Sequence, residues 1–497
     1  YLYTSEVRNG VSSQTLVGIA EGTHQVNEDL SWNIKFSVNE VDEPDRVINI
    51  HKQTNDGLAL EGIQFDIYYV AGRSDYLSGK VALPEPADFP YNGMPDYTII
   101  TDSSGNGSFN LTENHMPDGV YLVVEQQHPA IVAPVAPFYI IMPATSEDGS
   151  QLVYTVDVRP KNQVRGNVII EKDVVSIGND SATQDIYQPH TWIIGTSIPA
   201  DIGLGKSFVI SDTLDNRLDY AGNVRVRVEN QSGTTVAATL TEGLDYILSV
   251  TDVDSLSESK PSDAFTVSLT AAGMSKIESA MATGIDRIRV YFDAQINANA
   301  DMGVEIPNKA SLSYSNSVGV DFYVESDIPE VHTGGIQLVK IDAADPDRKL
   351  SNAEFKVYRA ATYAEIADES VIKEQIDGIS TQMVSVEFFT DPALTGEKTG
   401  TAVSDENGNA YIYGLAYGTY YLVETKAPAG YNLLSDPQEL TIHAASHLEN
   451  SIITVENTSG TILPETGGIG TTVYIIPGLI LMLAAAMLLL LKKRKAG

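Results

Sequence analysis

The chain of 497 residues contains no cysteine, which excludes disulfides, thiolate metal sites and a thiol nucleophile. Because extracellular proteins of this size often use disulfides, any covalent bracing must be of another kind. Basic residues are also scarce: 31 Lys and Arg stand against 66 Asp and Glu, for a formal net charge of −35. A surface that binds phosphates needs basic residues, so this balance excludes nucleic acid as a partner.

Patterns typical of enzymes are missing as well. No glycine-rich phosphate loop lies between a strand and a helix, and no histidine pair has metal-binding spacing, so we expect no enzyme, metal or cofactor. Asp405–Asn409 is better explained as a hairpin turn than as an incomplete calcium loop. The start, Tyr1–Thr4, has neither the basic residues nor the apolar run of a signal peptide, so we expect that a leader has been lost.

One long apolar run lies near the C-terminus. Val473–Leu491 contains 19 residues without a charge and is followed by the basic cluster Lys492–Lys495. As a helix this run would cover roughly 28 Å, close to the thickness of a hydrocarbon core. The pattern predicts a transmembrane helix with its basic end in the cytoplasm and the rest of the chain outside.

A pentapeptide precedes this run, and its residues are Leu463, Pro464, Glu465, Thr466 and Gly467. The order of pentapeptide, apolar span and basic tail resembles the cell-wall sorting signal of Gram-positive surface proteins. The resemblance implies that a sortase cuts between Thr466 and Gly467, passes Thr466 to an amine and discards the span. It also implies a secreted, wall-anchored protein that the C-terminal helix holds in the membrane only transiently.

Most of the chain before this signal consists of short runs of alternating apolar residues bounded by Gly, Asn, Asp and Pro, which predicts an all-β fold. We expect tandem immunoglobulin-like β-sandwich domains. Their predicted boundaries are 1–161, 162–330 and 331–460, followed by the sorting signal at 461–497.

The first and third domains share a plan, which indicates an internal repeat. Gly119–Glu125 and Gly418–Glu424 are similar runs of Gly, Tyr, Leu, Val and Glu. The rest of the pattern predicts short helices at Met274–Met281 and Tyr363–Gln375, and a linker at Ser326–Gly335.

The run Tyr421–Tyr431 resembles the E-box of sortase-assembled pilins, which belongs to a collagen-adhesin B-type domain. The resemblance implies that Glu424 assists an isopeptide bond between Lys340 and Asn457. Strand parity agrees, because each of these residues lies in line with apolar neighbours on its own strand. Burial would keep Lys340 neutral and nucleophilic, and Glu424 protonated and able to donate to the carbonyl oxygen of Asn457.

The middle domain offers Lys172, Asp212 and Asn316. Phe208–Leu214 resembles a segment of collagen-adhesin A-type domains, in which an Asp assists the bond. Asn308 has the same parity as Asn316 and is the alternative partner. We favour Asn316, because Lys172 ends its strand and a parallel neighbour would bring a strand-end Asn beside it.

The first domain offers Lys52, Glu125 and Asn162, and parity permits a bond there as well. Glu125, however, is followed by Gln126–Pro129 and not by the remainder of an E-box. The sequence therefore leaves open whether this bond forms.

The run Tyr154–Asn162 resembles the pilin motif, with Tyr154 at the usual Trp position and Arg159 at a usual Tyr. Parity puts Asn162 on the inward face and Lys161 on the solvent face. The resemblance implies that Lys161 is the acceptor that joins one subunit to the next.

These resemblances identify the chain as a backbone (shaft) pilin of sortase-assembled Gram-positive pili, a fimbrial protein that supports adhesion. The implied partners are identical subunits, sortase, tip and basal pilins, peptidoglycan and host receptors. The alternatives are a monomeric wall-anchored adhesin and a tip or basal pilin; a monomeric adhesin or a tip subunit would not need Lys161. A wall-anchored enzyme would need a catalytic constellation, and none is found in the sequence.

Overall fold

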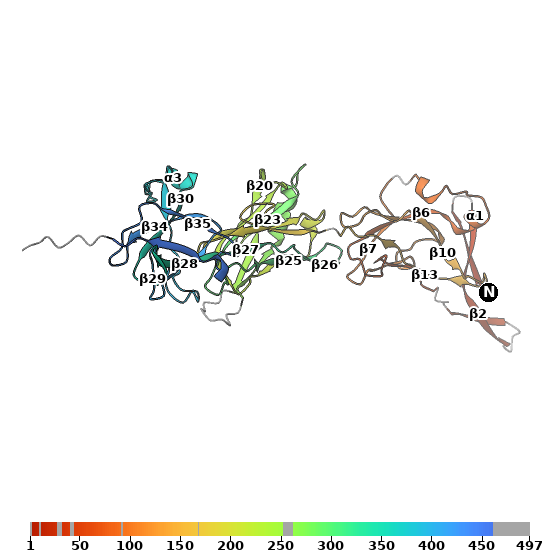
Figure 1. The fold of residues 1–497 in the computed structure, drawn as a ribbon. Helices are drawn as coiled ribbons and strands as arrows, with labels where there is room; N and C mark the ends of the chain where they lie inside the picture. Colours follow the sequence, from red (N-terminus) through yellow and green to blue (C-terminus); the bar gives the residue numbers. More distant parts are fainter. Residues whose placement is uncertain are drawn as a thin grey trace, which may run out of the picture.

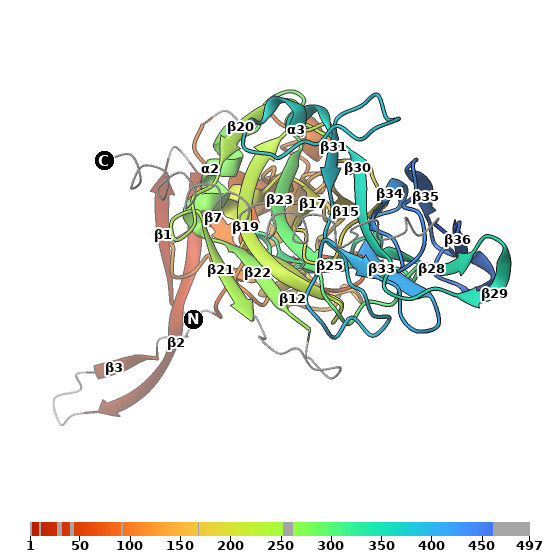
Figure 2. The same ribbon diagram turned by 60° about the vertical axis from the view of Figure 1, so that its left-hand side comes forward.

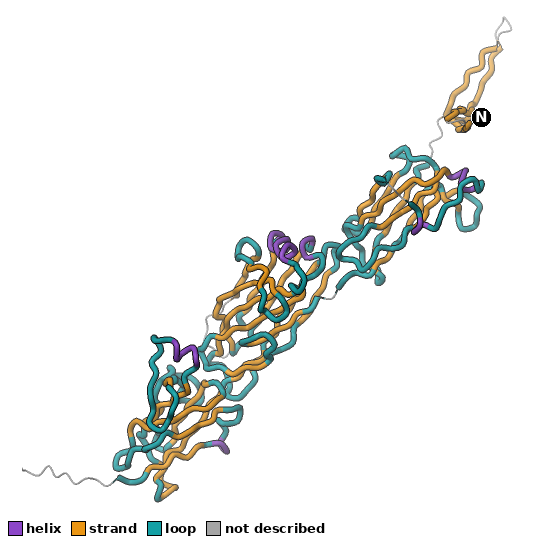
Figure 3. Tube along the Cα trace, turned by 90° about the horizontal axis from the view of Figure 1, so that it is seen from above, coloured by secondary structure: helices purple, strands orange, loops and turns teal. Residues whose placement is uncertain are grey.

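The computed structural model describes residues 2–8, 11–26, 32–39, 44–90, 93–166, 168–251 and 262–460. Within these ranges the chain is built from β-strands with three short α-helices, which confirms the all-β expectation. Figures 1 and 3 show the strands gathered into three units in a row. No helix in the described ranges is long and apolar enough to cross a membrane, and the predicted span at Val473–Leu491 lies outside them.

A separate N-terminal sheet precedes the first unit. Its strands β1 (Leu2–Arg8), β2 (Val11–Val26) and β3 (Trp32–Asn39) pair in chain order and antiparallel. Figure 2 shows this sheet projecting from the body of the protein, and Figures 1 and 3 show that it lies at the end of the row remote from the third unit. The sequence analysis predicted no strands in this segment. Because β1, β2 and β3 pair only with one another, the first unit proper begins with β4.

The first unit packs the three-stranded sheet β13-β4-β8 against the four-stranded sheet β10-β9-β6-β7. The first strand β4 and the late strand β13 are parallel, and β5 and β14 extend this pairing. Its elements are β4 (Val47–His51), β5 (Gln53–Thr54), β6 (Gln64–Gly72), α1 (Arg73–Leu77), η1 (Pro86–Asp88), β7 (Tyr97–Ile100), β8 (Asn106–Asn110), β9 (Gly119–Glu125), β10 (Phe138–Met142), β11 (Ala144–Thr145), β12 (Leu152–Val153), β13 (Thr155–Val158) and β14 (Lys161–Asn162).

The middle unit packs two five-stranded sheets, β15-β17-β23-β19-β20 and β21-β22-β18-β25-β26, and carries the small sheet β16-β27-β24 at its edge. The predicted helix at Met274–Met281 is present as α2. The elements are β15 (Ile170–Val174), β16 (Ser181–Thr183), β17 (His190–Ser197), η2 (Ile202–Leu204), β18 (Ser207–Thr213), β19 (Leu218–Glu229), β20 (Val236–Thr239), β21 (Tyr246–Thr251), β22 (Ala264–Leu269), α2 (Ala271–Ala280), β23 (Arg287–Ile296), β24 (Ile306–Pro307), β25 (Lys309–Ser315), β26 (Asp321–Glu325) and β27 (Glu330–His332).

The third unit repeats the plan of the first, because its first strand β28 again pairs parallel with the last strand β36 and antiparallel with β33. The second sheet, β31-β30-β34-β35, corresponds to β7-β6-β9-β10. The elements are β28 (Gly334–Asp342), β29 (Asp345–Lys349), β30 (Glu354–Ala360), α3 (Tyr363–Ala367), β31 (Met383–Ser385), β32 (Ala402–Val403), β33 (Asn409–Leu415), β34 (Gly418–Lys426), β35 (Gln438–Ile442), η3 (Glu449–Ser451) and β36 (Ile453–Asn457).

Two expectations for the third unit need correction. The predicted linker Ser326–Gly335 contains β27, whose Val331 is fully buried, and it also contains the start of β28. A side chain on Gly335 would collide with Tyr413, so this glycine permits close packing and does not mark a flexible link. The helix expected at Tyr363–Gln375 is only the five-residue α3, and the segment continues without helix.

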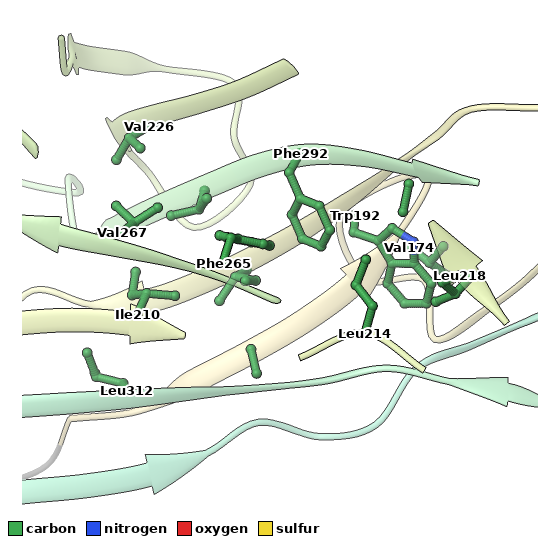
Figure 4. Packing of buried hydrophobic residues seen from close by; sticks show 14 of the residues in the cluster. Val174, Trp192, Ile210, Leu214, Leu218, Val226, Phe265, Val267, Phe292 and Leu312 are labelled. Carbon is green, nitrogen blue, oxygen red and sulfur yellow. The ribbon is translucent and has the colours of Figure 1, made fainter. Parts of the chain in front are cut away.

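The core of the middle unit lies between its two large sheets (Figure 4). Trp192, Phe265 and Phe292 are almost fully buried, and the rings of Phe265 and Phe292 meet edge to face with centroids 4.6 Å apart. Strand β18 sends Phe208, Ile210 and Asp212 into this core, as its alternation predicts. A carboxyl group therefore lies in a row of apolar side chains.

The middle and third units share part of one core. Ile186, which follows β16, is fully buried and packs in the same cluster as Phe389 and Tyr413 of the third unit. Its amide donates to Gly414 O at 3.0 Å, and its carbonyl accepts from Lys398 Nζ at 2.9 Å. Apolar and polar contacts therefore fix this joint together.

The first and middle units meet at the turn between β25 and β26. Val318, at the tip of this turn, is fully buried in the core of the first unit, and Val320 packs beside it. Val318 O accepts from Glu61 N at 3.1 Å, and Lys206 forms an ion pair with Glu61. Asn316 Oδ1 accepts from the amides of Val318 and Val320 at 3.2 and 2.8 Å, so its side chain holds the turn in shape.

We predict that Val318→Asp loosens the first joint, because an unpaired carboxylate in an apolar core costs roughly several kcal/mol. Small-angle X-ray scattering should show a wider range of molecular lengths than for the unchanged chain. The matched control is Val304→Asp, since Val304 lies in the same unit and is 43% exposed. Identical scattering from the Val318 variant and the control would contradict the docking role.

Candidate functional site

The third unit brings together the three residues that the sequence analysis singled out. Lys340 lies on β28, Glu424 on β34 and Asn457 at the end of β36, and each is at most 4% exposed. Lys340 Nζ contacts Asn457 Oδ1 and lies 3.4 Å from Glu424 Oε1. The backbone amide of Leu434 donates to Glu424 Oε2 at 2.9 Å and fixes the carboxyl group.

The environment of Lys340 disfavours charge. Burial lowers the pKa of its ammonium, and the nearby carboxylate of Glu424 opposes this shift. The ring of Phe355 lies 5.8 Å below the nitrogen and keeps water away from one side. A lysine in this setting reaches its neutral, nucleophilic form more easily than a surface lysine does.

The orientation of the amide differs from the expectation. The sequence analysis expects Glu424 to donate to the carbonyl oxygen of Asn457. In the structure Asn457 Nδ2 donates to both Glu424 oxygens at 3.0 Å, while the amide oxygen faces Lys340. The carboxyl group therefore lies against the nitrogen that would leave as ammonia, and it can pass a proton to that atom.

The first unit holds the same arrangement without an E-box. Lys52 Nζ lies 2.7 Å from Glu125 Oε2 and contacts Asn162 Oδ1, and Asn162 Nδ2 donates to Glu125 Oε1 at 2.6 Å. Backbone groups hold these side chains although the E-box is missing: Val135 N donates to Glu125, and Ala133 O accepts from Asn162 Nδ2 at 2.9 Å. Burial lowers the pKa of Lys52, and Glu125 opposes the shift.

The middle unit brings Lys172 and Asp212 together as a fully buried pair in direct contact. Burial lowers the pKa of Lys172 to about 8 despite the opposing effect of Asp212, and it raises the pKa of Asp212. The rings of Trp192 and Phe292 lie 5.2 and 5.6 Å from the Lys172 nitrogen.

The preference for Asn316 in this unit needs correction. Strand β18 runs antiparallel to β25 and pairs Asp212 with Ala310, whereas Asn316 lies beyond the pair of Ser207 with Ser315. This register puts Asn316 roughly 20 Å along the strand from Asp212, in the turn that docks on the first unit.

Asn308, the alternative partner, lies at the correct end of β25. Burial raises the pKa of Asp212, and the Asn308 side chain is close enough to that carboxyl group to offset part of the rise. Neither its amide nitrogen nor its oxygen makes a hydrogen bond of ordinary geometry with the described residues, and the side chain is buried. Asn308 is therefore the asparagine that the fold brings beside Asp212, which contacts Lys172.

Lys161 lies at the end of the first unit, in β14. The strand pairs parallel with β5 and alternates, so Lys161 is exposed while Asn162 is 3% exposed. Within the described part of the chain, the Lys161 side chain has no hydrogen bond or ion pair. Thr466, the donor that the sequence analysis expects, and the rest of Leu463–Gly467 lie outside the described residues.

Comparison with known families connects these features. Residues 40–163 match the N-terminal domain D1 of Gram-positive pilin subunits, and residues 456–496 match the LPXTG cell wall anchor motif. The chain is a Gram-positive pilin subunit. Residues 334–458 of this pilin match a prealbumin-like fold domain. The resemblance drawn from the sequence is thereby confirmed, and the anchor motif indicates a pilus attached to the cell wall.

Related proteins carry similar descriptions. The pilin is 28% identical over 441 residues to fimbrial subunit type 1 of Actinomyces viscosus, covering 80% of this chain and 76% of the relative. It is 24% identical over 476 residues to fimbrial subunit type 2 of Actinomyces naeslundii, covering 86% and 82%. These relatives and the matched families are structural subunits of fimbriae, so the pilin is not an enzyme.

Among solved structures, the pilin is similar to the major pilin BcpA of Bacillus cereus, with 22% identity over 84% of this chain and 100% of that one, at a TM-score of 0.42. It is also similar to the full-length major pilin SpaD of Corynebacterium diphtheriae. That comparison gives 21% identity over 85% and 99% of the two chains, also at a TM-score of 0.42.

Sequence reasoning missed the backbone groups that complete each site. The Val135 and Leu434 amides and the Ala133 carbonyl belong to residues whose side chains take no part. Asp327, whose carboxylate accepts from Lys172 N at 2.8 Å, was also missed. No residue-type pattern could have identified the three backbone groups, because every residue offers them.

Proposed function

We propose that this pilin is the shaft subunit of a covalent pilus that sortase assembles and anchors to peptidoglycan. The exposure of Lys161 carries the proposal: an acceptor amine must reach an enzyme-bound acyl group, and Lys161 projects into solvent beside the buried Asn162. A monomeric wall-anchored adhesin or a tip subunit would not need such an amine. Tip and basal pilins and host receptors are further partners of such a shaft.

The proposed reaction exchanges one amide for another. Sortase breaks the bond between Thr466 and Gly467, and the neutral amine of Lys161 on the next subunit attacks the Thr466 carbonyl carbon. An amide forms between the two subunits, and the tail that begins at Gly467 is released. Because donor and acceptor lie at different places on identical subunits, the bonds generate an open filament and not a closed ring.

We further propose that internal Lys–Asn isopeptide bonds brace all three units. The pairs are Lys52–Asn162, Lys172–Asn308 and Lys340–Asn457. In each, the lysine nitrogen attacks the Asn side-chain carbonyl carbon, one lysine proton passes by way of the carboxyl group to the amide nitrogen, and ammonia leaves. The assisting carboxyl groups are Glu125, Asp212 and Glu424.

Each bond would close a long loop within its unit. Lysine and asparagine are 110 residues apart in the first unit and 117 in the third. By the chain-entropy argument for cross-links, such a bond stabilises the native state by roughly 3–5 kcal/mol. Unlike a disulfide, it resists reductants, which suits a chain without cysteine.

We keep three domains in this proposal, with the first and third of collagen-adhesin B-type and the middle one of A-type. The first boundary shifts slightly. Asn162 pairs with β5 and its side chain belongs to the first site, so the first domain ends after Asn162 and not at Lys161. The middle domain, expected at 162–330, therefore starts at 163, and we keep the expected ranges 331–460 and 461–497.

The two asparagines of the middle unit make a matched test. The intact mass of the ectodomain should fall short of the sequence mass by three ammonia molecules. Asn308→Ala should remove one deficit and lower the melting temperature, because the cross-link is lost. Asn316→Ala should keep all three deficits, since its side chain only shapes the turn at the joint. Loss of a deficit in the Asn316 variant alone would restore Asn316 as the partner.

The middle bond should form more slowly above pH 8. The reactive pair holds one proton, with Lys172 neutral and Asp212 protonated, and that proton is lost as the pH rises past about 8. A mechanism that needed only the neutral amine would run faster as the pH rises, so the direction of the pH dependence distinguishes the two mechanisms. Unfolded chain from inclusion bodies can be refolded on both sides of pH 8 and followed by mass spectrometry, with circular dichroism to check folding. A rate that keeps rising above pH 8 would exclude the protonated acid.

Lys161→Arg should abolish polymerisation, because arginine keeps the charge but removes the usable amine. Cell-wall extracts should show monomer on an SDS gel in place of a high-mass ladder, and the internal bonds should remain. Lys80→Arg is the matched control, since Lys80 is an exposed lysine of the same unit. Polymer from the unchanged chain should yield a branched peptide that links Lys161 to Thr466; a branch on another lysine would move the acceptor there.

A further inference from the structure

The backbones of two buried lysines are held in the same way. Lys52 N donates to Gly105 O at 2.7 Å, and Lys340 N donates to Gly408 O at 2.7 Å. On the other side, the lysine carbonyls accept from Leu60 N and Leu350 N at 3.1 and 2.9 Å. Each lysine therefore sits between a turn and a returning segment of chain.

Both turn glycines occupy positions that other residues fit poorly. Gly105 and Gly408 have φ angles of +73° and +75°, and a Cβ on either would lie 2.3 or 2.5 Å from the carbonyl oxygen of its lysine. Backbone atoms at that distance must move apart. A side chain at either position would therefore push the lysine backbone out of place.

An aspartate shapes each turn. Asp102 Oδ1 accepts from the amides of Ser104 and Asn106 at 2.9 Å. Asp405 Oδ1 accepts in the same way from Asn407 and Asn409 at 2.8 Å. Asp405–Asn409 is a turn, as expected, but it does not close a hairpin, because β32 before it pairs with β30 and β33 after it pairs with β28. The turn lies directly behind Lys340.

We propose that Gly105 and Gly408 are positioning residues for the two bonds, and this inference rests on the internal cross-links proposed above. Each glycine lets the turn pack closely against the lysine backbone. This contact fixes the position of the lysine Cα, and therefore the position of Nζ relative to the asparagine side chain. A shift of about 1 Å in reacting atoms can cost ~100-fold in rate. We therefore expect Gly105→Ala and Gly408→Ala to slow their own bonds by roughly 10- to 100-fold.

The middle unit serves as an internal reference. There the backbone amide of Lys172 donates to the Asp327 side chain at 2.8 Å and not to a turn glycine. Neither glycine substitution should therefore change the Lys172–Asn308 bond in the same molecule.

The test follows each bond separately during refolding, by intact mass and peptide mapping. Gly149→Ala and Gly378→Ala are the matched controls, because these glycines have φ angles of +71° and +82° but no atom closer than 4.0 Å to an added Cβ. They carry the same backbone strain without touching a lysine. Slow bond formation in the Gly105 and Gly408 variants, with normal rates in both controls, supports positioning.

A second variant serves if Gly408→Ala does not fold. Asp405→Ala loosens the turn without adding an atom next to Lys340, and it should also slow the third bond. Its control is Asp391→Ala, which removes a similar set of hydrogen bonds, to Ala393 N and Thr395 N, from a loop away from the lysine.

The outcomes separate the two proposals. If the unchanged chain loses no ammonia, the internal bonds themselves are refuted. If it does, and the Gly408 and Asp405 variants react as fast as their controls, only the positioning role is overturned.

Discussion

A lysine buried in an apolar sandwich needs a partner, and much of this structure follows from that need. An uncompensated ammonium in such a place would cost several kcal/mol, so each lysine contacts a carboxyl group. In the middle and third units the two groups come from different sheets, from β15 and β18 and from β28 and β34, and in the first unit Lys52 directly follows β4 while Glu125 lies on β9 of the other sheet. The polar pair therefore fixes how one sheet sits on the other. The asparagine then adds a group with which the lysine can react.

The joints extend this order along the row of units. Val318 enters the core of the first unit from the middle one, and Ile186 of the middle unit shares a core with Phe389 of the third. Hydrogen bonds accompany both contacts, so tilting one unit against the next would expose apolar surface and break polar pairs. A shaft with proposed covalent braces within its units gains little if its units hinge freely. The packing at both joints supports a stiff subunit.

Strand parity correctly predicted which side chains face inward, but it could not predict which residues of neighbouring strands lie opposite each other. The alternation of side chains correctly turned Lys340, Glu424 and Asn457 inward and Lys161 outward, because that period is local to each strand. Asn308 and Asn316 share one parity, so only the pairing of β18 with β25 could separate them. That pairing depends on residues about a hundred positions apart, which the local pattern does not contain. The strand inside the expected linker was hidden for the same reason, since its partners β16 and β24 are remote in sequence.

The first unit shows that the same arrangement of lysine, carboxyl group and asparagine can form without the motif. Its chain after Glu125 lacks the E-box, yet the Val135 amide holds the carboxyl group as the Leu434 amide does in the third unit. The Ala133 carbonyl adds a contact to Asn162 that has no counterpart among the contacts of Asn457. A motif such as the E-box is one sequence that forms a loop of this kind. Other sequences can form a similar loop, because the groups that hold the carboxyl group and the asparagine belong to the backbone. The absence of an E-box is therefore weak evidence against a bond wherever the fold buries lysine, carboxyl and asparagine together.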